Sequence, residues 1–212
     1  MNDVVTKADK MKALFSIAAC VVAASLAAPA RAQVDSDMPP MRDGSDLRQP
    51  EVKLPPDPVG AGEDLRLAGK CDRAVVNLRP FAERGAGNEI AQFNLGMCLL
   101  DLAAHATDPA RTADMRHEGA QWILQAANAG LGKAQAQAVV LYLDGTGVAS
   151  DPAEADKWAL IYHNNGMRIS VGMPDIGPAV KSRLDAALTD ATRAQARSRA
   201  DDWKQTVQAS DQ

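Results

Sequence analysis

The chain has 212 residues and a formal net charge of −4 at pH 7, with 46% hydrophobic and only 4% aromatic side chains. This length accommodates one domain with flanking segments. The acidic balance argues against nucleic acid as a partner, because nucleic-acid phosphates attract basic surfaces.

Residues 1–32 have the layout of a secretory signal peptide. Three lysines precede an unbroken run of small and apolar residues from 13 to 28, and small residues then surround Arg31, so we expect cleavage after Ala32. The run, roughly 16 residues long, is shorter than the ~20 residues that a membrane-spanning helix needs. The sequence therefore predicts export, with a mature charge of about −6.

Export leads to the periplasm or to the exterior, and the sequence does not distinguish these two destinations. It also leaves open whether translation starts at Met1 or Met11, and whether Cys20, within a lipobox-like Ile-Ala-Ala-Cys, is lipidated. The mature chain keeps only Cys71 and Cys98. In an oxidising compartment such a pair is expected to form a disulfide, with a reactive thiol pair as the alternative.

Residues 33–60 carry six of the twelve prolines and show neither a helical nor a strand period. Proline fixes φ and removes a hydrogen-bond donor, so this segment is predicted to be an extended, largely disordered leader. Its expected role is to tether the domain or to dock on it.

Beyond residue 60 the sequence repeats itself, which is the signature of a repeat architecture. Three stretches of the pattern superpose without gaps at offsets of 45 and 36 residues: 74–85, 119–130 and 155–166. A second alignment pairs residues 91–101 with 134–144. We therefore predict an all-α solenoid of about three helix pairs over 61–166, followed by a capping loop and helices over 167–212.

Residues 134–166 resemble a Sel-1-like repeat, a relative of the tetratricopeptide repeat. The family's order of aromatic residue, Gly-x-Gly-Val turn, acidic residue and second-helix anchor is kept at Tyr142, Gly145, Gly147, Val148, Asp151, Ala155 and Trp158. Residues 91–130 are a looser copy, in which an insert at 102–111 replaces the glycine-rich turn. The resemblance implies helix-turn-helix units stacked side by side.

Each matched position has a physical reason. Gly96 permits close approach of a partner helix, while Gly145 and Gly147 supply positive φ in the turn. Asp151-Pro152 predicts a capped helix start. Trp122 and Trp158 are predicted to be buried against the next unit, at roughly 2 to 3 kcal/mol each. The helix-closing glycines are expected at Gly85, Gly130 and Gly166.

In tetratricopeptide-like stacks the first helices line the concave face. By that resemblance the face carries apolar residues, namely Ile90, Phe93, Met97, Leu100, Ala136, Val140 and Leu143. An exposed apolar groove typically marks a binding site for a peptide or a helix, and these residues form our candidate binding surface. The alternatives are that the leader or the 167–176 loop fills the groove, or that several of these residues are core.

The sequence contains no recognisable catalytic motif: no Gly-x-Ser-x-Gly, His-Glu-x-x-His, phosphate-binding glycine loop or Cys-x-x-Cys. His105, His117 and His163 are too far apart for one helical face, so neither a metal site nor a cofactor is predicted. The expected function is a protein-binding scaffold without chemistry, acting on a peptide or an envelope protein.

Two other functions stay open. Cysteine-rich exported relatives of the family are associated with penicillin binding and weak β-lactam hydrolysis. Those relatives carry a cysteine pair in nearly every repeat, whereas this chain has one pair and no Ser-x-x-Lys sequence. An assembly subunit of a larger envelope complex is the third possibility.

Overall fold

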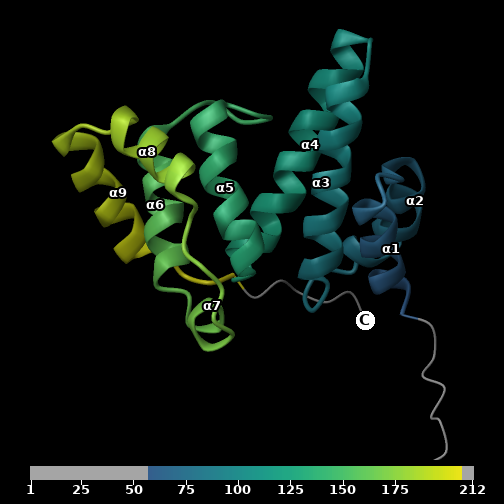
Figure 1. Ribbon diagram of the computed structural model, residues 1–212, viewed down its shortest axis with the longest axis horizontal. Coiled ribbons are helices and arrows are strands. Elements are labelled where there is room, and N and C mark those ends of the chain that lie inside the picture. Colours follow the sequence, from purple (N-terminus) through teal and green to yellow (C-terminus); the bar gives the residue numbers. More distant parts are fainter. Residues whose placement is uncertain (1–56, 207–212) are drawn as a thin grey trace, which may run out of the picture. The chain divides into compact units, whose positions relative to one another are not determined.

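A computed structural model describes residues 57–206 of the chain. The predicted signal peptide, nearly all of the predicted leader and residues 207–212 lie outside this range. Within it, all regular secondary structure is helical (Figure 1). The helices are α1 (Pro58–Leu67), α2 (Cys71–Ala82), α3 (Glu89–His105), α4 (Pro109–Asn128), α5 (Gly132–Asp144), α6 (Pro152–His163), α7 (Gly166–Ser170), α8 (Pro178–Ala187) and α9 (Asp190–Asp202).

The first six helices form three successive pairs, α1/α2, α3/α4 and α5/α6. Each helix contacts the next one along the chain, and α1 also contacts α3. This nearest-neighbour packing is that of a short helical solenoid, because each pair buries its apolar side only by stacking on the adjacent pair. The predicted all-α repeat fold is confirmed.

Three helices begin with an N-cap aspartate followed by proline. The side chains of Asp57, Asp108 and Asp151 each accept a hydrogen bond from the backbone N–H two residues later, at 3.0, 3.0 and 2.9 Å, and proline follows each aspartate. An N-cap carboxylate accepts a hydrogen bond from a free helix N–H, and proline at the first helical position has no N–H that would need an acceptor. Only the cap at Asp151 was predicted.

The two unpredicted caps change the expected boundaries. Helix α1 begins at Pro58, inside the segment expected to be leader. The expected insert at 102–111 is mostly helical, because α3 continues to His105 and α4 starts at Pro109. The additional residues of the second unit therefore lengthen its two helices rather than forming a long loop.

Helices α3 and α4 pack closely at a pair of glycines. A Cβ atom added at Gly96 would lie 2.6 Å from the carbonyl oxygen of Gly119, and one at Gly119 would lie 2.8 Å from the carbonyl oxygen of Gly96. Backbone therefore meets backbone at this crossing, and neither position has room for a methyl group. The predicted role of Gly96 is confirmed, and the partner residue is Gly119.

The turn between α5 and α6 uses both expected glycines. Gly145 and Gly147 have φ of 65° and 72°, and a Cβ at Gly147 would lie 2.1 Å from the carbonyl oxygen of Arg116 in α4. Gly130, after α4, also has a positive φ. The expectation for Gly166 is wrong, because α6 ends at His163 and Gly166 is instead the first residue of α7.

The apolar core falls into two clusters. The first surrounds Cys71 and Cys98, and the second surrounds Trp158, whose side chain is 1% exposed. Trp158 meets the Trp203 ring edge-to-face with centroids 6.2 Å apart, so its contact with the following elements is as expected. Trp122 differs from the prediction. It is half-buried and packs on the first cluster, which belongs to the preceding helices.

A polar contact explains the orientation of Trp122. Its Nε1 donates a hydrogen bond to Glu118 at 3.2 Å, and the same carboxylate accepts from Arg79 of α2 at 2.5 Å. The hydrogen bond from Arg79, together with that from Trp122, outweighs burial and lowers the pKa of Glu118. The indole is thus held toward α2.

The C-terminal elements cover the last helix pair. Helix α9 packs along α6, and α8 contacts both α5 and α6. Helix α9 ends at Asp202, and Trp203 leaves it with extended backbone angles (φ −67°, ψ 136°). Among residues 57–206, no helix is both long and apolar enough to span a bilayer.

Cys71 and Cys98 form a disulfide between α2 and α3, as predicted. Both cysteines are buried, and their Cα atoms lie 4.9 Å apart. The bond joins the first helix pair covalently to the second, so the first pair does not rely on packing alone.

Replacing Gly96 by alanine should lower the free energy of unfolding by about 1 to 3 kcal/mol, because the new methyl group must push α3 away from α4. Chemical denaturation followed by circular dichroism measures the change. Gly177→Ala is the matched control, since an added Cβ there meets no atom within 4 Å. Equal stability of the two variants would show that the α3–α4 crossing tolerates a wider spacing.

Replacing both Cys71 and Cys98 by alanine should cost about 3 to 4 kcal/mol of unfolding free energy, by the chain-entropy estimate for the 27-residue separation. Denaturation midpoints with and without a reducing agent measure this loss. The reductant should destabilise the parent protein and leave the double variant unchanged. A parent protein that is insensitive to full reduction would contradict the stabilising role.

Candidate functional site

The predicted binding residues do not form a single exposed apolar groove. Ile90 is 51% exposed, whereas Phe93 is only 9% exposed and belongs to the second core cluster. Met97 and Leu100 are half-buried and pack against that cluster, and Val140 is half-buried. The expectation that Phe93 faces a partner is therefore wrong, because its ring fills the interior between neighbouring helix pairs.

Charged residues occupy much of the surface that the first helices share. Lys133 of α5 forms an ion pair with Glu63 of α1 at 3.6 Å, and Arg66 of α1 donates a hydrogen bond to Asn94 of α3 at 2.6 Å. Side chains from all three first helices thus meet on one side of the stack. We call Glu63, Arg66, Ile90 and Lys133 the first-helix surface; Ile90 lies one turn before Asn94.

A buried glutamine joins each helix pair to the next. Nε2 of Gln92 in α3 donates to the carbonyl of Ala82 in α2 at 3.1 Å, and Nε2 of Gln135 in α5 donates to the carbonyl of Ala127 in α4 at 3.3 Å. Both side chains are fully buried or nearly so. Each glutamine adds a side-chain donor to a helix-end carbonyl that also accepts from a backbone N–H of the following turn, that of Gly85 at Ala82 and that of Gly130 at Ala127.

The two glutamines were missed as structural residues, although the sequence contained the signal. They occupy the same position in the two aligned segments, where Ala91 precedes Gln92 and Ala134 precedes Gln135. A polar residue repeated within a predicted buried helix is expected to have a repeated hydrogen-bond partner.

After the third helix pair, Asn165 and Arg168 form the hydrogen bonds at the helix end instead of a buried glutamine. Asn165 donates to the side-chain oxygen of Gln135 at 2.8 Å and to the carbonyl of Gly130 at 3.0 Å. Arg168 of α7 then donates to the carbonyls of Tyr162, His163 and Met173 at 2.9, 2.7 and 2.8 Å. One guanidinium group thus occupies the carbonyls at the end of α6, and α7 stops after a single turn.

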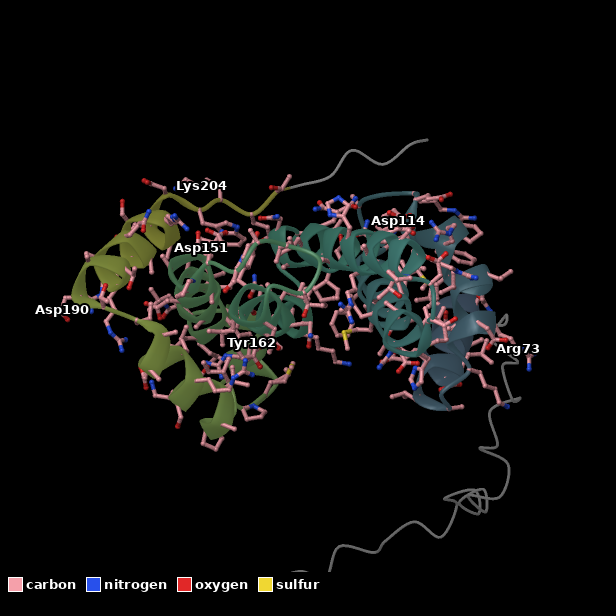
Figure 2. The ribbon with its side chains drawn as sticks, turned by 90° about the horizontal axis from the view of Figure 1, so that it is seen from above. Arg73, Asp114, Asp151, Tyr162, Asp190 and Lys204 are labelled. Atoms are coloured by element: carbon pink, nitrogen blue, oxygen red, sulfur yellow. A yellow bond between two sulfur atoms is a disulfide. The ribbon has the colours of Figure 1, made fainter. Side chains whose placement is uncertain are left out.

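The loop after α7 is fixed by two more contacts. The hydroxyl of Tyr162, labelled in Figure 2, donates to the carbonyl of Pro174 at 2.8 Å, and His163 Nδ1 lies 2.5 Å from a carboxylate oxygen of Asp175. Burial disfavours ionisation of Asp175, but the hydrogen bond from His163 and that from the Ile176 N–H outweigh it and lower the pKa of Asp175. The predicted capping loop is therefore tied to α6.

A pocket of about 770 Å³ opens beside this polar region. Its apolar wall consists of Leu131, Leu160, Ile161, Met167, Ala200 and Trp203. Four carboxamide side chains also line the pocket, those of Gln135, Asn164, Asn165 and Gln205. Three charged residues line it as well, Glu89, Arg197 and Asp201. An apolar wall with convergent hydrogen-bonding groups is typical of a ligand-binding pocket.

The remaining site chemistry is sparse in the part of the chain described. Both cysteines are in the disulfide, and no group of three or more His, Cys, Asp or Glu residues among residues 57–206 could hold a metal ion. His105, His117 and His163 make separate local contacts on different elements.

Comparison with known proteins gives one informative match. No protein-family model matches the chain, and no curated protein matches it. The chain is similar to the crystal structure of c5321, a protective antigen present in uropathogenic Escherichia coli strains that displays an SLR (Sel1-like repeat) fold. The identity is 26% and the TM-score 0.55, over 69% of this chain and 29% of that chain.

The chain thus spans less than a third of the length of c5321. The match agrees with the resemblance seen in the sequence, and it supports a Sel1-like repeat fold for this chain.

Replacing Gln135 by leucine should lower the unfolding free energy by about 1 to 3 kcal/mol, because the carbonyl of Ala127 and one amide donor of Asn165 lose their buried partner. Thermal and urea denaturation measure the loss. Gln121→Leu makes the same chemical change at an exposed position of α4 and should change stability by less than about 0.5 kcal/mol. Equal effects at the two positions would argue against a joining role for Gln135.

Proposed function

We propose that the chain is an exported scaffold that holds a peptide or another envelope protein on its first-helix surface and performs no reaction itself. The observation that carries this proposal is the meeting of α1, α3 and α5 side chains on one side of the stack, through the Lys133–Glu63 and Arg66–Asn94 contacts. Such a surface offers an exposed apolar residue, Ile90, one turn before Asn94 on α3, together with charged groups that discriminate between partners.

Export is supported by the chemistry of the cysteines. A buried disulfide that joins two repeat units is typical of proteins that fold in an oxidising compartment. The N-terminal sequence of basic residues, apolar run and small residues agrees with this destination. The proposal therefore places the partner in the cell envelope or outside the cell.

Surface charge supports a protein partner. The mature chain is acidic, and the basic residues of the first-helix surface, Arg66 and Lys133, are both within reach of Glu63. This arrangement does not form the continuous basic patch that nucleic acid requires. A partner with alternating charges around an apolar side chain would complement it.

The test is capture of envelope proteins by the mature chain, expressed with its signal and purified from the periplasm, where a chain beginning at Gln33 is expected. Ile90→Asp should reduce the captured amount at least tenfold, because it places a charge in the centre of the surface. Val76→Asp is the matched control. Val76 is 76% exposed on α2, a second helix, so its change should leave capture unaltered.

Two outcomes would contradict the proposal. Equal capture by both variants would place the binding site elsewhere on the molecule. Turnover of a chromogenic β-lactam by the purified chain would favour the cell-wall alternative over a scaffold without chemistry.

A further inference from the structure

The last described residues form a strap over the end of α4. We use the name C-terminal strap for residues 203–206, which follow α9 in extended conformation and appear in Figure 2 as the yellow segment labelled at Lys204. Three hydrogen bonds attach it to residues more than seventy positions earlier in the chain. Trp203 Nε1 donates to Asn128 Oδ1 at 3.2 Å, the Thr206 N–H to the Asn128 carbonyl at 2.8 Å, and Gln205 Nε2 to the Ala129 carbonyl at 2.7 Å.

These contacts are those of a bound extended peptide. One backbone N–H and two side-chain donors of the strap pair with α4 residues at the helix end, including the Asn128 and Ala129 carbonyls that no further helical turn can satisfy. The surface also fits the strap closely at Gly130, where an added Cβ would lie 2.8 Å from the Gln205 amide nitrogen. The Trp203 indole packs edge-to-face on Trp158. Polar groups thus fix the register, and the aromatic contact adds apolar area.

The strap also forms part of the 770 Å³ pocket, because Trp203 and Gln205 line it. Beneath the strap lie the turn from α4 to α5 and, in the pocket, the ends of α6 and the start of α7. Movement of the strap would therefore uncover the Asn128 and Ala129 carbonyls beside the pocket.

Helix α9 has an anchor that is independent of the strap. Arg199 contacts Asp151 at 2.8 Å and Glu154 at 3.0 Å, and Ala196 of α9 is fully buried. Asp151 is the N-cap of α6, so this contact holds α9 to the last helix pair. The strap can leave its place while the cap stays on the stack.

We propose that the surface under the C-terminal strap is a docking site for an extended segment of a partner protein, and that the strap occupies this site until the partner exchanges with it. The partner's segment has an aromatic side chain with an N–H donor and, two residues later, a carboxamide side chain, in the same spacing as Trp203 and Gln205 of the strap. This inference rests on the proposed scaffold function and names a second surface, distinct from the one that contains Ile90. A strap joined to the same chain competes at a high effective concentration, so the partner binds more weakly than it would to an empty site.

The experiment measures binding of a fluorescent peptide with the sequence of residues 200–208 to full-length mature protein. A strap-released variant, Trp203→Ala with Gln205→Ala, should bind the peptide at least tenfold more tightly than the parent protein does. The same peptide with alanine in place of its tryptophan should bind neither protein. Lys204→Ala is the control within the strap and should match the parent, because both contact-forming side chains remain.

A second variant tests the inference in case the first variant does not fold. Gln205→Ala with Thr206→Pro leaves the Trp203 side chain intact but removes two of the three hydrogen bonds that hold the strap, so the strap should leave the site more readily and this variant should also bind the peptide more tightly than the parent does. Circular dichroism and the thermal midpoint establish that each variant is folded.

Three results would overturn the inference. Folded strap-released chains that do not bind the peptide would show that the surface holds the strap only in its own chain. Equal binding by parent and released chains would place the peptide elsewhere. A concentration-dependent dimer of the parent that the peptide dissociates would make a second copy the occupant. If Ile90→Asp still reduces envelope capture in any of these cases, the inference about the strap site is wrong and the proposed scaffold function is unaffected.

Discussion

The structure depends on hydrogen bonds that join one helix pair to the next at the ends of the second helices. Each short pair has an apolar side that it cannot bury alone, and stacking brings backbone carbonyls at the helix ends into the interior. Gln92 and Gln135 satisfy those carbonyls from the first helix of the following pair. Each of these carbonyls also accepts from a backbone N–H of the turn after its helix, so the glutamine supplies the additional hydrogen bond that comes from the next helix pair.

The two ends of the stack are stabilised differently. At the N-terminal end of the described residues a disulfide joins α2 to α3, so the first of these helix pairs is held covalently as well as by packing. At the C-terminal end Arg168 takes the helix-end carbonyls that another glutamine would otherwise take, and α8 and α9 cover the last pair.

The end of α4 has a further donor. The carbonyls of Asn128 and Ala129, at the turn after α4, are paired by the strap. The first-helix surface and the strap site are then two different kinds of surface. The first presents charged side chains around Ile90, whereas the second presents backbone acceptors beside an aromatic contact.

The candidate site was only partly predictable. Ile90 is exposed as expected, but Phe93 is core, because periodicity identifies the apolar positions of a helix without showing which of them the next helix covers. The ion pair between Lys133 and Glu63 joins residues on α5 and α1, and no local pattern connects them. The glutamine positions were visible as aligned residues, yet their partners were not.

The sequence by itself determined the helix-turn-helix repeat, the glycine turn before α6 and the cysteine pairing. Each of these follows from local backbone preference, from repetition at fixed offsets or from the small number of cysteines. Only the tertiary structure decided that Gly96 faces Gly119, that Trp122 turns back toward α2, and that the last helix stops at Asp202 to release the strap. These features depend on which surfaces come together in space, and contacts between distant residues are a property of the packed chain rather than of any segment within it.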